Sequence, residues 1–127
     1  MGGALAVIAT LHLRNQGFQV SVTTFGQPKI TDLDGAEKMT SLDLMRFADG
    51  KDIVPLMPPV DWKPGQTVRP YAHFGREVDL VDSNYECLEQ HYKSKDPTVW
   101  MGEADKQTLG DHSMVMYKLR ISRLIGK

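Results

Sequence analysis

The feature that most constrains this chain is an apolar helical pattern that starts almost at its first residue and leads directly into a strand pattern. Apolar side chains recur at the spacing of one helix face, at Ala4, Leu5, Val7, Ile8 and Leu11. Gly17 is a typical stop signal after a helix. Residues 18–25 then alternate apolar and polar side chains and end in a Gly-Gln-Pro turn. A helix followed at once by a strand is half of a βαβ unit, so the sequence predicts an α/β fold.

The start of this helix leads to a second prediction, which concerns whether the chain is part of a longer protein. No Ser, Thr, Asp or Asn precedes it to cap the free backbone N–H groups of its first turn. Ala6 and Leu13 extend apolar character around the helix, so we expect it to be almost wholly buried. A buried helix without a cap is typical of an element that has been cut from a larger fold. We therefore expect this chain to be part of a longer protein.

The middle of the chain predicts shorter elements. Asp32 stands near the start of an expected helix over residues 33–44, and a short strand follows over residues 44–48. Residues 53–59 contain three prolines and cannot lie inside a central strand. Residues 71–74 and 77–81 read as two strands of a hairpin.

The last third of the chain predicts little regular structure until its end. Residues 87–92 are expected to form a helical turn, and residues 93–110 a loop. Asp111 is expected to cap a final helix. The apolar face of that helix would consist of Met114, Tyr117, Ile121, Leu124 and Ile125.

Composition excludes several classes of function. The chain has 127 residues, enough for one domain, with 15 basic and 16 acidic side chains and a formal charge of −1. This balance argues against binding nucleic acid through phosphate neutralisation. The single cysteine, Cys87, excludes an intrachain disulfide and a multi-cysteine zinc site. Four scattered histidines make a metal site unexpected, and we expect no cofactor. No apolar stretch reaches the length of a membrane span.

Two residues stand where catalytic groups gather in α/β folds. Asp52 comes just after an expected strand, and His112 comes just before the last helix. Ligands and catalytic groups in open α/β sheets gather beyond the carboxyl ends of the strands. An Asp followed later by a His matches the order of the α/β-hydrolase triad. From these residues alone, Asp52 is as readily explained as a turn residue, and Asp111-His112 as a helix cap.

Five segments, in order along almost the whole chain, resemble the class 3 (fungal-type) lipases. Gly-Gly-Ala-Leu-Ala at residues 2–6 is similar to the end of that family's Gly-His-Ser-x-Gly-Gly-Ala-Leu-Ala nucleophile elbow. The other segments lie at residues 24–30 (Thr-Phe-Gly-Gln-Pro-Lys-Ile), 51–55 (Lys-Asp-Ile-Val-Pro), 71–78 (Tyr-Ala-His-Phe-Gly-Arg-Glu-Val) and 111–117 (around Asp-His). The family commonly has Asn where this chain has Asp49. Any one of these segments is weak, but five in family order are a specific signal.

This resemblance implies a serine ester hydrolase acting on triacylglycerols or similar acyl esters at a lipid–water interface. It implies an α/β-hydrolase fold with a mostly parallel sheet, flanking helices and a hairpin. Residues 1–127 would be the C-terminal half of the domain, starting at the helix after the nucleophile elbow. Met1 would then hold the x position of the elbow, and the nucleophilic serine would lie just before it. An extracellular location is favoured by the resemblance only.

The resemblance also assigns roles to individual residues. His112 would be the general base, and Asp52 would accept its Nδ1–H bond and fix its tautomer. The backbone N–H of Met1 would belong to the oxyanion hole. The walls of the acyl-chain groove would be Leu56, Met57, Pro58 and Leu109. Without the serine, we expect no meaningful turnover from this chain alone.

Two other functions stay open on the sequence. The chain could be a non-catalytic protein of the same fold that starts at Met1, either a pseudoenzyme or an acyl-lipid-binding module. A third interpretation is an unrelated small α/β binding domain, in which Asp52 and His112 have no catalytic role. His73 is expected to be a packed, hydrogen-bonded histidine rather than a ligand.

Overall fold

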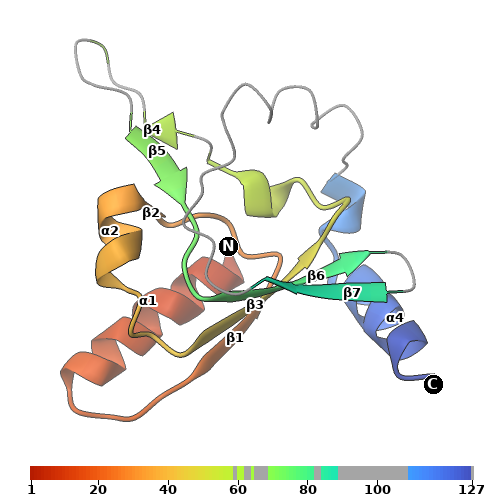
Figure 1. Ribbon diagram of the computed structural model, residues 1–127, viewed down its shortest axis with the longest axis horizontal. Coiled ribbons are helices and arrows are strands. Elements are labelled where there is room, and N and C mark those ends of the chain that lie inside the picture. The colour runs from red at the N-terminus through yellow and green to blue at the C-terminus, as the bar shows by residue number, and fades with distance from the viewer. Residues whose placement is uncertain (59, 62–63, 65–68, 82–83, 89–108, 127) are drawn as a thin grey trace.

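The computed structural model describes residues 1–58, 60–61, 64, 69–81, 84–88 and 109–126 (Figure 1). Its larger sheet has the strand order β1-β3-β6-β7. The strands are β1 (Val22–Phe25), β3 (Leu44–Asp49), β6 (Arg76–Val81) and β7 (Asn84–Leu88). β3 runs parallel to both β1 and β6, and β7 is antiparallel to β6. The predicted α/β class, with a mostly parallel sheet flanked by helices, is confirmed.

A smaller antiparallel sheet has the order β2-β5-β4. Its strands are β2 (Thr31–Asp32), β4 (Val60–Asp61) and β5 (Arg69–Ala72). The predicted hairpin of residues 71–74 with 77–81 is therefore wrong, because β5 and β6 belong to different sheets. Both edges of β6 are already occupied by β3 and β7, so the hairpin of this region is β6–β7.

The strand β7 also corrects the helical turn predicted from residue 87. Cys87 pairs with Val78 across the β6–β7 ladder, in a strand that ends at Leu88. The ladder hydrogen bonds available at the open edge of β6 override the weak local helical pattern. Most of the loop predicted over residues 93–110 lies outside the described residues.

The first helix, α1 (Gly2–Asn15), begins where the sequence predicts, and Met1 supplies no side-chain cap. Only Val7 and Thr10 of α1 are buried, whereas Leu5 and Ile8 are 59% and 55% exposed. The prediction of an almost wholly buried helix is therefore wrong for this chain. One face of α1 meets the apolar core, which comprises Val7, Val22, Ala36, Leu42, Leu44, Ala72 and Phe74.

The second helix, α2 (Leu33–Lys38), is shorter than the predicted residues 33–44. Asp32 caps it as expected, because its Oδ1 accepts a hydrogen bond of 3.0 Å from the backbone N–H of Gly35. That hydrogen bond is the main reason why the pKa of Asp32 lies below its usual value. The chain turns after Met39 so that β3 can start at Leu44.

The last helix, α4 (Met114–Leu124), is capped by Ser113 rather than by Asp111. The Ser113 Oγ accepts from the backbone N–H of Met116 at 3.2 Å, while Asp111 ends a 3₁₀ helix at Leu109–Asp111. The buried residues of α4 are Tyr117 and Arg120. The predicted apolar face is confirmed in part: Tyr117 is buried and Ile121 and Leu124 are half-buried, whereas Met114 and Ile125 are each 62% exposed.

Candidate active site

Asp52 lies in a tight turn just beyond the carboxyl end of β3. Its backbone N–H donates to the carbonyl of Asp49 at 2.8 Å, and its Oδ1 accepts from the backbone N–H of Val54 at 2.8 Å. The residue is 2% exposed. A 3₁₀ helix at Val54–Leu56 follows, which agrees with the expectation that the proline-containing segment stays outside the sheets. The turn therefore holds one buried carboxylate with its second oxygen available to other partners.

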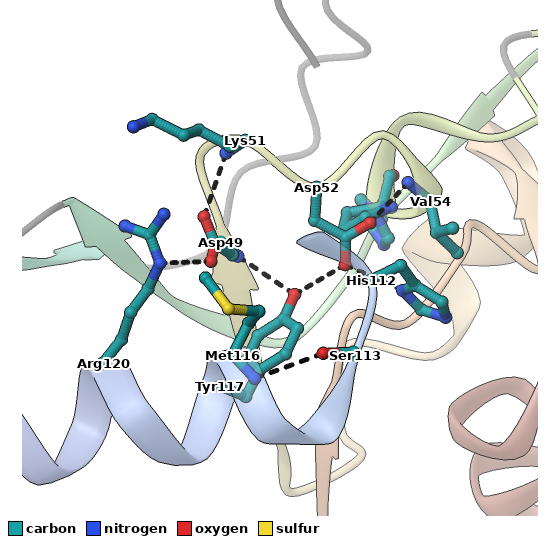
Figure 2. A network of polar contacts seen from close by, with 11 residues as sticks. Asp49, Lys51, Asp52, Val54, His112, Ser113, Met116, Tyr117 and Arg120 are labelled. Carbon is teal, nitrogen blue, oxygen red and sulfur yellow. Dashed lines mark hydrogen bonds and ion pairs between the residues drawn. The ribbon is translucent and has the colours of Figure 1, made fainter. Parts of the chain in front are cut away.

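His112, which is 60 residues further along the chain, meets that second oxygen. Its Nδ1 lies 2.8 Å from Asp52 Oδ2 (Figure 2). The imidazole is 31% exposed, whereas the Asp52 carboxylate is fully buried. An Nδ1–H donated to a buried carboxylate leaves the lone pair of the ring on Nε2, where it can accept a proton.

Tyr117 is the third partner of Asp52. Its hydroxyl donates to Asp52 Oδ2 at 2.8 Å and accepts from the backbone N–H of Asp49 at 3.0 Å (Figure 2). Burial, helped by the negative charge of Asp52, raises the pKa of the Tyr117 hydroxyl. The hydroxyl therefore keeps its proton for Asp52, and the carboxylate is surrounded by donors on both oxygens.

A second buried carboxylate, that of Asp49, lies in the same turn. Its Oδ1 accepts from the backbone N–H of Lys51 at 3.0 Å, and Arg120 Nε lies 2.5 Å from its Oδ2. Burial raises the pKa of Asp49, and the charges of Asp111 and Asp52 raise it further. The Lys51 hydrogen bond and the positive charge of Arg120 act in the opposite direction.

Gly26, at the end of β1, lies directly against the Asp–His pair. A Cβ at this position would come within 2.7 Å of both Asp52 Oδ2 and His112 Nδ1. Its φ of +58° is also a conformation that side chains disfavour. The backbone N–H of Gly26 donates to the carbonyl of Phe47 at 2.9 Å. Close approach and backbone conformation together require glycine here.

A cavity of about 210 Å³ opens beside the imidazole. The start of α1 forms one side of it and the start of α4 the other, with the lining residues Met1, Gly2, Gly3, Phe25, Gly26, His112, Ser113, Met114 and Tyr117. The uncapped first turn of α1 carries free backbone N–H groups and the positive end of the helix dipole. A group that develops negative charge would be stabilised at this position.

The remaining predicted site residues belong to the two 3₁₀ helices. Leu56 ends the first of them, and Met57 and Pro58 follow it, with Met57 40% exposed. Leu109 begins the second, before His112. Leu56, Met57 and Pro58 are not among the described residues that line the cavity, and the role of all four in an acyl-chain groove stays a prediction.

His73 is packed and hydrogen-bonded, as predicted. Its Nε2 lies 2.7 Å from the carbonyl of Pro55 and donates to it, and its buried Nδ1 has no hydrogen-bond partner among the described residues. Arg46 pairs with Glu77 at 2.6 Å and donates to the carbonyl of Phe74 at 2.9 Å. Burial, and then the charge of Arg46, hold the pKa of His73 well below 6.5.

Sequence reasoning missed three contributors to the site. The sequence assigns Gly26 to a turn and Tyr117 to the apolar face of the last helix, and it does not single out Arg120. One signal for the last two was present. Tyr117 and Arg120 are three residues apart, so their polar groups share one face of α4 and indicate a polar contact there.

Among the described residues, no group of three or more His, Cys, Asp or Glu side chains could hold a metal ion. No helix in the same part combines the length and apolar character needed to cross a membrane.

Two comparisons with known proteins each find similarity to a lipase. The profile of the family described as "Lipase (class 3)" matches residues 1–62. A solved triacylglycerol lipase, described as having a serine protease triad at its catalytic centre, is similar in structure with a TM-score of 0.61 and 21% identity. The match covers 87% of this chain and 42% of that one, so this chain spans less than half the length of the lipase. At this identity the structural match speaks for the fold.

Proposed function

We propose that this chain, whose residues 1–62 match the class 3 lipase family and whose fold is similar to that of a triacylglycerol lipase, is part of a serine ester hydrolase. The substrates would be triacylglycerols or similar acyl esters. The observation that carries the proposal is the 2.8 Å contact between Asp52 Oδ2 and His112 Nδ1 at the carboxyl edge of the sheet. A buried carboxylate, a partly exposed imidazole and an adjacent helix start support the proposal, since acyl transfer by a serine triad uses such groups.

The proposed chemistry divides the work between two side chains. Nε2 of His112 takes the proton of a serine hydroxyl as that oxygen attacks the ester carbonyl. It later gives the proton to the leaving alcohol. Asp52 holds the tautomer and stabilises the imidazolium that forms in between. The Tyr117 hydroxyl and the Val54 N–H support this role, since both donate to the Asp52 carboxylate.

The start of α1 supplies the second part of the proposal. In a longer polypeptide the nucleophilic serine would directly precede Met1, and the backbone N–H of Met1 would donate to the oxyanion. The cavity shared by Met1 and His112 supports this, because both groups must reach the same reacting carbonyl. The acyl chain would pass along Leu56, Met57, Pro58 and Leu109.

Residues upstream of Met1 would provide the rest of the domain. Two observations support this reading. The chain spans 42% of the matched lipase. Among the described strands, β1 pairs with β3 alone, and Leu5 and Ile8 of α1 are more than half exposed. We therefore propose that residues 1–127 are the C-terminal part of the domain and turn over no ester by themselves.

The decisive experiment extends the reading frame upstream of Met1 and measures hydrolysis of tributyrin and p-nitrophenyl esters. The extended protein should be active, and a phosphonate ester should label the serine before Met1. D52N should lower kcat by about 10³- to 10⁴-fold, because the imidazole loses its tautomer and orientation. H112Q should lower kcat by a similar factor.

Matched controls separate the site from general damage. D43N alters an exposed carboxylate that pairs with Arg76, and H12Q alters an exposed imidazole on α1. Both variants should keep near-normal activity. An upstream frame without a serine at the elbow, or full activity in D52N, would contradict the proposal. In the first case, binding of fatty-acid esters to the chain itself would favour the acyl-lipid-binding module instead.

A further inference from the structure

The helix α4 is held against the sheet by polar side chains. Its two buried residues, Tyr117 and Arg120, are 2% and 6% exposed. Its large apolar residues Met114, Val115 and Leu119 are 62%, 74% and 41% exposed. Apolar contacts also hold α4, because Met116, Ile121 and Leu124 are half-buried and the Tyr117 ring packs edge-on against Phe25 with centroids 5.9 Å apart. Such burial has no preferred direction, so the directional contacts of the helix are the polar ones of Tyr117 and Arg120.

Both polar anchors end on the same short turn after β3. Tyr117 contacts the backbone N–H of Asp49 and the carboxylate of Asp52, while Arg120 pairs with the carboxylate of Asp49. Figure 2 shows the two side chains reaching from one face of α4 toward that turn. His112, just before α4, meets the other carboxylate of the turn. A change in the rotation of α4 would displace all three contacts together.

The charges in this turn make the arginine important. Asp49 and Asp52 are both fully buried carboxylates and lie three residues apart. A buried carboxylate needs a compensating charge and good hydrogen-bond geometry to stay ionised. Arg120 provides that charge, and its planar guanidinium fixes direction better than a lysine would. Polar contacts of this kind restrict angles, whereas apolar burial does not.

We propose that the Arg120–Asp49 ion pair is a positioning unit of the active site, which fixes α4 so that His112 Nδ1 and the Tyr117 hydroxyl both meet Asp52 Oδ2. Arg120 acts through the helix and does not touch the substrate. The inference rests on the proposed function only for the role of the imidazole. The contact that it explains can be measured on this chain without any catalysis.

The experiment follows the imidazole of His112 by ¹⁵N NMR in the chain itself. The double variant D49N/R120M removes both charges, so no uncompensated ion stays buried. We expect it to remain folded while the Nδ1–H proton of His112 exchanges with water at least about 10-fold faster, because α4 loses one of its two anchors. R120K keeps the charge but not the fork, and should give a smaller acceleration.

R123M, which changes an exposed arginine on the same helix, is the matched control and should leave the exchange rate of the His112 Nδ1–H proton unchanged.

The results that overturn the inference are definite. If D49N/R120M is folded and shows wild-type proton exchange at His112, the ion pair does not position the imidazole. Should the double variant unfold, R120K decides: a wild-type exchange rate in R120K overturns the inference, and a measurable acceleration supports it. Failure of the extended protein to hydrolyse esters would remove the proposed function but leave these measurements intact.

Discussion

The apolar core and the polar edge of this protein are built on different principles. The apolar core, defined above by seven buried side chains from Val7 to Phe74, is held by burial, which has no preferred direction. The polar edge, comprising Asp49, Asp52, His112, Tyr117 and Arg120, is held by hydrogen bonds and ion pairs with fixed geometry. Side chains of the apolar core can therefore shift slightly after a small substitution, whereas the hydrogen bonds and ion pairs of the polar edge fix the positions of its atoms.

The two long helices, α1 and α4, show the same difference between burial and polar contacts. α1 is attached to the core through Val7, with Ala6 and Leu11 partly buried beside it, while Leu5 and Ile8 are more than half exposed. α4 is attached to the edge through Tyr117 and Arg120. Figure 1 shows the two helices on opposite sides of the view, with strands of the larger sheet between them. The start of each helix nevertheless lines the same cavity, so the site joins an element placed by burial to one placed by polar contacts.

Among changes that keep both Asp52 and His112, the largest effect should come from adding one methyl group at the polar edge. G26A would place a Cβ within 2.7 Å of Asp52 Oδ2 and His112 Nδ1, which must separate to admit it. In the extended enzyme we expect kcat to fall by at least about 100-fold, since a misplaced general base loses most of its effect. The measurement is ester hydrolysis, together with the Nδ1–H signal of His112.

The matched control for this change is G17A. Gly17 also has a positive φ, of +89°, but a Cβ there meets nothing within 4 Å. Both variants should lose about 1 kcal/mol of stability to backbone strain. Equal activity losses in G17A and G26A would mean that backbone strain, and not contact with the Asp–His pair, is responsible.

A smaller effect should follow from weakening the core. V7A deletes two methyl groups from a side chain that is fully buried, so the free energy of unfolding should fall by about 2 kcal/mol. The contact between Asp52 and His112 should not change, because hydrogen bonds and not burial fix its geometry. Urea unfolding measures the loss of stability, and the His112 proton signal reports on the contact. L5A, which truncates an exposed side chain of the same helix, should change stability by less than about 0.5 kcal/mol.

The smallest effect is a pH dependence that only a buried polar group can produce. The folded protein holds the pKa of His73 below its ordinary value of 6.5, so the unfolded chain binds a proton that the folded one excludes. This contribution to stability is complete above about pH 6.5 and is lost as the pH falls toward the lowered pKa. The loss should approach about 1.4 kcal/mol per pH unit.

Comparing urea unfolding at pH 7.5 and pH 5.5 tests this slope. H73Q should reduce the stability lost between pH 7.5 and pH 5.5 by about 1 kcal/mol, because glutamine does not titrate. H12Q removes an exposed histidine from α1 and should retain the wild-type slope. If stability depends on pH in H73Q as it does in the wild type, groups other than His73 cause the acid sensitivity.

Much of the local structure could be predicted from the sequence. The helix at the start, the strands β1 and β3, the Asp32 cap and the position of Asp52 after a strand all follow from periodicity and turn chemistry within a few residues. The strand pairing of residues 71–81 could not be predicted. A hairpin pattern is local, but the partner of β6 depends on which strand edges the rest of the sheet leaves open.

The sequence by itself determined which chemical groups this protein carries and their order: a carboxylate after an expected strand, an imidazole before the last helix, and an uncapped helix at the start. Tertiary structure alone decided that Gly26 lies against the Asp–His pair, that Tyr117 joins Asp49 to Asp52, and that Arg120 pairs with Asp49. The physical reason is the separation along the sequence over which each interaction acts. Helix periods and turns depend on neighbouring residues, whereas contacts between groups 60 or more residues apart exist only once the sheet and helices have packed.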